Sequence, residues 1–290
     1  MKKLIALLAP AALTLCLLAV SVARGDTVRS GTFSRAGASL YWEEHGDPAH
    51  PPLVLLHGFG ESMAVWRPYQ DALAVSYDVV LLDLRGHGRS TNSHEAFSFK
   101  EVAEDLLALM DHLHHARFRA VGASSGGIAL LHAASRAPGR FEGLVLVSAA
   151  PDVGPQARAR VREIAADKGS LDYLRQFAAR GDAQVNMLQR QFAALADSSD
   201  AAVTSEQLAA ISAPTLIVHG DRDEFFPVEV AVSLYRSIRS SYLRVYPNDG
   251  HEPIYNPRAV EDFSHLLLEF FSGKWQHPDG EGHDASTAAR

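Results

Sequence analysis

The sequence has a single cysteine and no excess of positive charge, and each of these absences excludes a class of protein. Cys16 is the only cysteine in 290 residues, which excludes an intramolecular disulfide framework and a zinc site built from several thiolates. Lysine and arginine number 27 against 34 aspartates and glutamates, so no basic footprint predicts nucleic-acid binding. The hydrophobic fraction of 47% is enough to build a large core and excludes disorder for most of the chain.

The first 23 residues have the pattern of a secretory signal peptide. Two lysines follow Met1, an uncharged apolar run extends from Leu4 to Val22, and the small residues Ser21 and Ala23 are typical of a cleavage site. We therefore expect cleavage after Ala23 and a periplasmic or secreted protein. The alternative is an uncleaved leader that anchors the protein in a membrane, because the run approaches the length that spans a bilayer.

Beyond the leader, short apolar segments alternate with longer amphipathic segments. Segments 27–33 and 39–44 predict an opening hairpin. Further strands, buried on both faces of a mostly parallel sheet, are predicted at 53–56, 79–82, 118–121, 144–147, 216–218 and 243–246. Helices are predicted at 63–74, 99–114, 125–137, 228–238 and 257–271. This alternation is typical of an α/β protein with a doubly wound sheet and right-handed crossovers.

Two regions depart from the alternation. Residues 151–210 carry helical patterns without a convincing strand, and about sixty residues is more than a crossover connection needs. We therefore predict a small helical cap inserted after the sixth strand, between core segments 27–150 and 211–276. Residues 277–290 contain almost nothing to bury and predict a disordered tail.

A nucleophile motif lies between a predicted strand and a predicted helix. Gly122-Ala123-Ser124-Ser125-Gly126 contains Gly-x-Ser-x-Gly, a turn so sharp that larger side chains flanking the serine would collide. The helix N-terminus beside this turn favours negative charge that develops on a substrate. Ser124 is therefore the predicted nucleophile, and Ser125, which also has small neighbours, is the alternative.

A serine hydroxyl needs a base and an orienting carboxylate, which follow the serine in the order acid, then histidine, in this architecture. Asp221 and Asp223 lie just after the predicted strand 216–218, and His251 lies just after 243–246. The carboxyl ends of parallel strands share one edge of the sheet, so these loops are expected to meet the serine. Asp152, after another strand, is a further candidate acid.

A glycine-bearing loop, His57-Gly58-Phe59-Gly60, follows the predicted strand 53–56. Such a loop aims the backbone N–H of Phe59 at a carbonyl oxygen bound over the serine, and the N–H of Ser125 would be the second oxyanion donor. The loop lacks the Gly-Lys-Ser/Thr of a P-loop, so it does not predict phosphate binding.

Together these motifs resemble the α/β-hydrolase superfamily and are similar to its capped esterase, perhydrolase and carbon–carbon hydrolase branch. Asp83-Leu-Arg-Gly-His-Gly-Arg-Ser90 resembles a further motif of that branch. The resemblance covers residues 38–272, apart from the insertion. It places the catalytic acid at the second aspartate of its loop, Asp223, rather than at Asp221.

The resemblance implies a serine hydrolase. Ser124 would attack a carbonyl carbon, His251 would take its proton, and Asp223 would orient the imidazole. The amides of Phe59 and Ser125 would hold the oxyanion, and water would release the acid from an acyl-enzyme. We expect a carboxylesterase for small to medium apolar acyl groups, with a small-molecule substrate, no nucleic-acid partner, no cofactor and no metal.

Several alternatives stay open. The same triad serves hydrolysis of a lactone or of a carbon–carbon bond in a diketone, and perhydrolysis. An acyltransferase and a non-catalytic ligand-binding protein are further possibilities on this scaffold. The cluster of His112, His114 and His115 is interpreted as solvated residues at a helix end rather than as zinc ligands. No motif indicates an oligomeric state.

Overall fold

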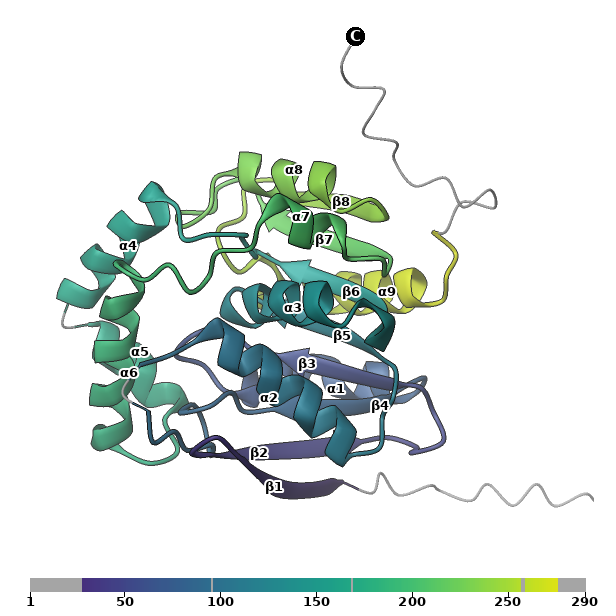
Figure 1. Cartoon of the computed structure of the whole chain (residues 1–290), viewed down its shortest axis with the longest axis horizontal. Helices are drawn as coiled ribbons and strands as arrows, with labels where there is room; N and C mark the ends of the chain where they lie inside the picture. The colour runs from purple at the N-terminus through teal and green to yellow at the C-terminus, as the bar shows by residue number, and fades with distance from the viewer. Residues whose placement is uncertain (1–27, 95, 168, 257–258, 276–290) are drawn as a thin grey trace, which may run out of the picture.

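The structure is a computed structural model that describes residues 28–94, 96–167, 169–256 and 259–275. The predicted signal peptide (1–23) and the predicted tail (277–290) lie outside the described residues. Figure 1 shows one sheet with helices on both faces and a group of helices across one end of the strands. Within the described residues, no helix combines the length and apolar character needed to cross a membrane.

The described residues contain a single eight-stranded sheet in the order β1-β2-β4-β3-β5-β6-β7-β8. Strands β1 and β2 form the predicted hairpin, β2 pairs antiparallel with β4, and every later pair is parallel. The predicted mostly parallel, doubly wound sheet is therefore confirmed. The strands are β1 (Arg29–Arg35), β2 (Ala38–His45), β3 (Pro52–Leu56), β4 (Asp78–Leu82), β5 (Phe118–Ala123), β6 (Phe141–Val147), β7 (Thr215–Gly220) and β8 (Ser241–Tyr246).

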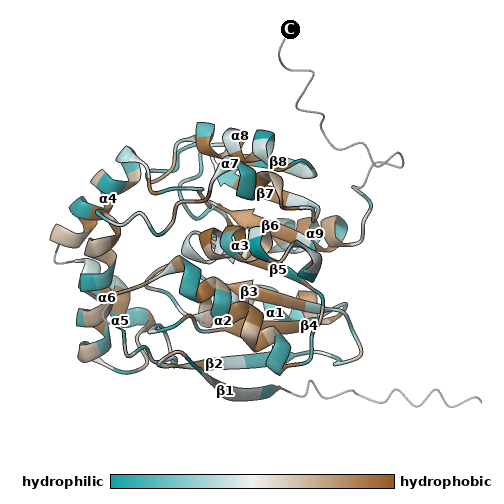
Figure 2. Ribbon diagram, viewed as in Figure 1, coloured by the Kyte–Doolittle hydropathy of each residue, from teal (hydrophilic) through white to brown (hydrophobic). Residues whose placement is uncertain are grey.

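Alternate residues of the buried strands supply two separate cores. Successive side chains of a strand point to opposite faces, so the unbroken apolar run of β3 serves both sides of the sheet. Val54 and Leu56 join the core on one face, whereas Leu53 and Leu55 join the core on the other. Figure 2 shows the resulting hydrophobic band along the central strands.

Amphipathic helices cover both faces of the sheet. One core contains apolar residues of α2 (Phe99–His112), α3 (Ser125–Arg136) and α8 (Val228–Ser237). The other contains residues of α1 (Arg67–Ala74) and α9 (Ala259–Phe271). These two layers leave the carboxyl ends of the parallel strands free to carry loops, which is where ligands bind in open α/β sheets.

The region between β6 and β7 is helical, and four helices are described in it: α4 (Pro155–Ala166), α5 (Ser170–Phe177), α6 (Asp182–Leu195) and α7 (Ser205–Ala209). Helices α4 and α5 both pack on α6, and Figure 1 shows the three together beside the strand ends. We call α4–α6 the cap. Helix α7 packs instead against α3 and α8, on the core, although the predicted insertion 151–210 includes it.

Specific polar contacts attach the cap to the core. The side-chain amide of Gln184 in α6 donates hydrogen bonds to the carbonyl oxygens of Gly86 and Gly88, at 2.8 and 2.9 Å. The segments before α4 and after α6 also meet, because the N–H of Val203 donates to the carbonyl of Pro151 at 2.8 Å. The cap is therefore attached to the core through α6, and the chain segments that enter and leave it are joined to each other.

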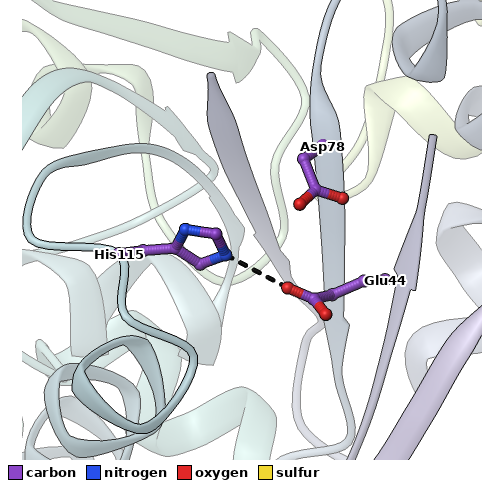
Figure 3. Close-up of side chains that lie close together, drawn as sticks. All are labelled: Glu44, Asp78 and His115. Carbon is purple, nitrogen blue, oxygen red and sulfur yellow. Dashed lines mark hydrogen bonds and ion pairs between the residues drawn. The ribbon is translucent and has the colours of Figure 1, made fainter. Parts of the chain in front are cut away.

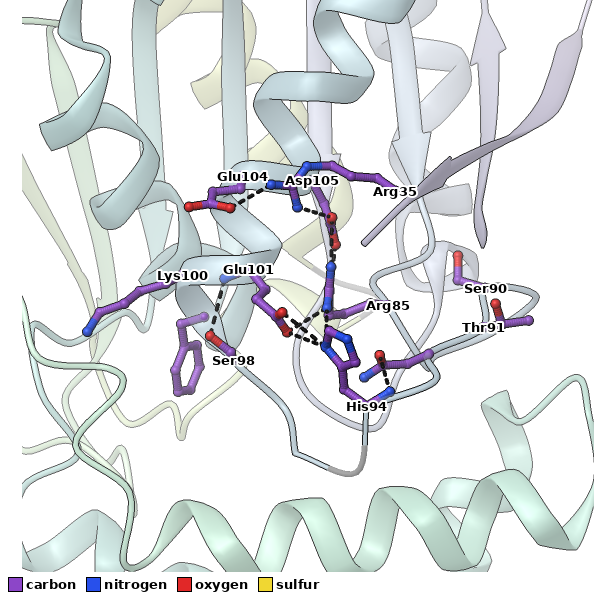
Figure 4. A network of polar contacts seen from close by, with 12 residues as sticks. Arg35, Arg85, Ser90, Thr91, His94, Ser98, Lys100, Glu101, Glu104 and Asp105 are labelled. Atoms are coloured by element: carbon purple, nitrogen blue, oxygen red, sulfur yellow. Dashed lines mark hydrogen bonds and ion pairs between the residues drawn. The ribbon is translucent and has the colours of Figure 1, made fainter. Parts of the chain in front are cut away.

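The loop that carries Gly86 and Gly88 is held by a buried ion-pair network (Figure 4). Arg85 is fully buried, and its guanidinium donates to both carboxylate oxygens of Asp105 at 2.7 and 2.9 Å. It also donates to Glu101 at 2.5 Å, while Arg35 of β1 reaches the same Asp105 at 3.0 Å. The bidentate pairing fixes the loop against α2 and so supports the glycine carbonyls that receive the cap.

Candidate active site

Ser124 lies in the sharp turn between β5 and α3. Its backbone has φ 46° and ψ −115°, a conformation that non-glycine residues rarely adopt. Glycine is required on both sides: a Cβ on Gly126 would lie 2.7 Å from the carbonyl oxygen of Leu56, and one on Gly122 would lie 2.6 Å from the Gly126 backbone. The motif therefore folds into an elbow because only glycine fits two residues before and two residues after the serine.

Three predicted residues form one hydrogen-bonded chain. The hydroxyl of Ser124 lies 2.9 Å from Nε2 of His251, and Nδ1 of His251 lies 2.8 Å from Oδ2 of Asp223. They come from the loops after β5, β8 and β7, which meet at the carboxyl edge of the sheet. The structure places the alternative acids elsewhere: Asp221 accepts from the backbone of Asn248, and the side chain of Asp152 is 55% exposed.

The environment of Asp223 keeps its carboxyl ionised. Burial raises the pKa of Asp223, but hydrogen bonds from His251 and from the N–H groups of Phe225 and Phe226 outweigh burial and hold the pKa below its usual value. His219, which the sequence motifs did not single out, lies 3.6 Å from the same carboxylate. Burial lowers the pKa of His219, so this ring stays neutral. It therefore does not compete with His251 as the charged partner of Asp223.

The glycine-bearing loop lies directly against the serine. A Cβ on Gly58 would be 3.5 Å from Cβ of Ser124. His57 is fully buried and braces this loop, since its Nδ1 pairs with the carbonyl of Gly58 at 2.7 Å and its Nε2 accepts from the N–H of Leu84 at 3.0 Å. Burial lowers the pKa of His57 to about 4, so the ring is neutral. His57 therefore positions the loop that carries Phe59.

A cavity of about 380 Å³ opens over Ser124 between the cap and the core. This volume is in the range of small-molecule sites. Phe59 and Ser125, the predicted oxyanion residues, both line it, and so do Phe225 and Phe226, whose rings lie beside His251. The cap contributes an apolar wall made of Val161, Ile164, Leu174, Phe192 and Leu195.

The charged lining is acidic. Among the described residues that line the cavity, Glu224 and Glu252 are the carboxyl side chains, and no lysine or arginine accompanies them. Glu252 hydrogen-bonds to a second buried carboxyl, Glu61. The sequence patterns identified neither Glu252 nor Glu61. The only available signal was their position, Glu252 next to His251 and Glu61 next to the glycine-bearing loop.

A second cluster, whose members do not line the cavity, brings together residues of β2, of β4 and of the segment after α2 (Figure 3). Ligand atoms of Glu44, Asp78 and His115 lie within 4.8 Å of one another. His115 pairs with Glu44 at 3.1 Å, and Arg29 donates to Glu44 at 3.0 Å and to Asp78 at 2.7 Å. Arg29 already supplies the positive charge that the two carboxylates need, so a metal ion here would have to displace it.

Comparison with known proteins places these features in a family. The family model described as alpha/beta hydrolase fold matches residues 51–186. The pimeloyl-[acyl-carrier protein] methyl ester esterase of Yersinia enterocolitica is 32% identical over 260 residues, covering 80% of this chain and 96% of that protein. A match to the dihydrolipoyllysine-residue acetyltransferase component of the acetoin cleaving system of Pseudomonas putida reaches 40% identity over 114 residues, but this chain spans only 31% of that protein's length.

Solved structures agree with the sequence comparison. A hydrolase from Pseudomonas aeruginosa superposes with a TM-score of 0.66 at 26% identity, covering 84% of this chain and 98% of the other. The sheet order, the elbow at Ser124 and a relative matched over almost its whole length lead to one conclusion: the chain belongs to the α/β-hydrolase family.

Proposed function

We propose that this α/β hydrolase is a serine hydrolase that cleaves carboxylic esters of small to medium apolar acyl groups. The observation that carries the proposal is the hydrogen-bonded chain from Ser124 through His251 to Asp223, which faces an apolar cavity. A carbonyl carbon placed over Ser124 is the electrophile that such a chain can attack. The similarity to a methyl ester esterase supports the same bond type.

The reaction follows from the positions of these groups. Nε2 of His251 removes the proton from Ser124 as its oxygen attacks the ester carbonyl, and Asp223 stabilises the imidazolium that forms. The N–H groups of Phe59 and Ser125 stabilise the oxyanion. His251 then gives its proton to the leaving alcohol, an acyl-enzyme remains on Ser124, and a water deprotonated by His251 releases the acid.

The cavity supports a limited acyl chain. Its walls include many phenylalanine, leucine, isoleucine and valine side chains from the cap and core, which favour an apolar acyl group. Its size and the cap over it favour butyryl to octanoyl esters over palmitoyl esters.

A fluorophosphonate probe and an ester series test the proposal. The probe should add its mass to Ser124, and Ser124→Ala should abolish hydrolysis of p-nitrophenyl butyrate while Ser125→Ala keeps the labelling. Hydrolysis by Ser124→Ala at the native rate would refute the assignment of the nucleophile. A panel from acetyl to palmitoyl esters, with a lactone and a diketone added, then separates ester hydrolysis from the related activities, and product analysis with added alcohol identifies an acyltransferase.

A further inference from the structure

Glu61 connects three parts of the site through one carboxylate. It follows the glycine-bearing loop directly, and only 1% of its surface is exposed. Oε2 accepts from the N–H of Gly58 at 2.8 Å and from the hydroxyl of Tyr255 at 3.0 Å, and Oε1 accepts from the hydroxyl of Tyr173 at 3.0 Å. Gly58 belongs to the oxyanion loop, Tyr173 to cap helix α5, and Tyr255 to the segment after His251.

Glu252 completes the hydrogen bonding of this carboxylate. Its side chain hydrogen-bonds to Glu61, and it lies next to His251 and lines the cavity. Two buried carboxyls in contact cannot both ionise near neutral pH. Because Glu61 already accepts from three donors, it is the ionised partner, and Glu252 holds the proton that they share. A carboxylate has about four acceptor positions, so Gly58, Tyr173, Tyr255 and Glu252 together satisfy it.

The surroundings of the pair make its proton sensitive to alkaline pH. Burial, then the charge of Glu61 and the hydrogen bond to it, and then the charges of Glu224 and Asp223 together raise the pKa of Glu252 to about 9. Tyr173 and Tyr255 face the same charges, and burial raises the pKa of both hydroxyls, so they stay protonated and continue to donate. Above about pH 9, loss of the shared proton would set two carboxylates against each other between the cap and the oxyanion loop.

We propose that Glu61 is a positioning residue, which shares one proton with Glu252 and holds the oxyanion loop, the cap and the His251 loop together for catalysis. The inference rests on the proposed ester hydrolysis. Gly58 precedes Phe59, so the bond from the Gly58 N–H to Glu61 sets where the N–H of Phe59 points. Small displacements of an oxyanion donor cost large factors in rate. The bond to Tyr173 makes that placement depend on the position of cap helix α5.

Three variants test Glu61 on the full chain with p-nitrophenyl butyrate. Glu61→Gln keeps the size but halves the acceptor capacity, and we expect kcat to fall about tenfold or more with a smaller change in KM. Tyr173→Phe removes only the bond to the cap, and we expect faster amide hydrogen exchange in α5 and a few-fold higher KM. Glu229→Gln, at an exposed glutamate on α8, is the matched control and should leave kcat, KM and the hydrogen exchange of α5 unchanged.

The pH profile separates positioning from a merely structural role. In the native protein kcat should fall as pH rises through about 9, after subtraction of hydrolysis by hydroxide, because Glu252 loses its proton. Glu252→Gln keeps a donor to Glu61 and cannot ionise, so this alkaline fall should disappear. A native profile that stays flat to pH 10, or a Glu61→Gln protein with native kcat, KM and α5 exchange, would overturn the inference. Failure of the ester hydrolase proposal itself looks different, because Ser124→Ala would then match the native rate.

Discussion

Replacing Asp223 with asparagine tests the geometry of the triad most directly. One oxygen of Asp223 accepts from the backbone N–H groups of Phe225 and Phe226, at 2.8 and 2.9 Å, and the other faces Nδ1 of His251 at 2.8 Å. An asparagine oxygen has to take the first position, since an NH₂ group there would meet two donors. Its NH₂ group then donates to Nδ1 of His251, which forces the proton onto Nε2.

The size of the effect follows from this tautomer. With a proton on Nε2, His251 has no lone pair facing Ser124 and cannot remove its proton. The same change in an unrelated serine protease lowers kcat by about 10⁴, which corresponds to about 5.4 kcal/mol of transition-state stabilisation. We therefore expect kcat of Asp223→Asn to fall by about 10⁴, with the circular dichroism spectrum unchanged.

The assay compares kcat for p-nitrophenyl butyrate in Asp223→Asn and Asp221→Asn, with active sites counted by fluorophosphonate. Asp221 accepts from the N–H of Asn248, and asparagine keeps an acceptor oxygen there, so kcat should stay within about threefold of native. An Asp223→Asn enzyme within tenfold of native, or a larger loss in Asp221→Asn, would refute the reasoning.

Three further predictions concern the cavity, the buried ion pairs and the elbow. Esters whose acyl chain ends in a free carboxylate should show kcat/KM at least about tenfold below neutral isosteres, because Glu224 lines the cavity and no lysine or arginine lines it, and Glu224→Gln should narrow that gap. Arg85→Leu should lower the free energy of unfolding in urea by about 3 kcal/mol, since Asp105 loses a bidentate partner; an unchanged midpoint would contradict this. Gly126→Ala should lower kcat at least about tenfold because its Cβ meets backbone oxygens. Gly139→Ala is the control and should leave kcat unchanged, because its Cβ would meet nothing within 4 Å.

The fold was predictable because its signals are local and repeated. Each central strand is an apolar run bounded by turn residues, so the predicted strand 79–82 differs by one residue from β4. The predicted helix 63–74 instead begins with a 3-10 turn, Met63–Trp66, and becomes α-helical at α1. Proline at position 68 explains this boundary, because it has no N–H to donate into a continuous helix.

The candidate site was predictable only where its residues follow strand ends or glycine motifs. Ser124 and His251 stand at such positions, and the structure brings them within 2.9 Å of each other. Glu61 and Glu252 had no comparable signal, since a single glutamate beside a motif is normally a solvated residue. Only tertiary packing gives them partners, because it buries Glu61 against Tyr173 and Tyr255 and brings Glu252 into hydrogen-bond contact with Glu61. The motif that contains Arg85 could be recognised in the sequence, but its acceptors on α2, Glu101 and Asp105, could not.

The contact between Val203 and Pro151 has a consequence for how this protein family can change. Because the segments just before α4 and after α6 are bridged by a hydrogen bond of 2.8 Å, the chain enters and leaves the cap at almost one point. A segment with adjacent ends behaves as a replaceable module, since its exchange requires no new register between β6 and β7. Exchange of the segment between these junctions, by evolution or by design, would replace the cap wall of the cavity while Ser124, Asp223 and His251 stay untouched.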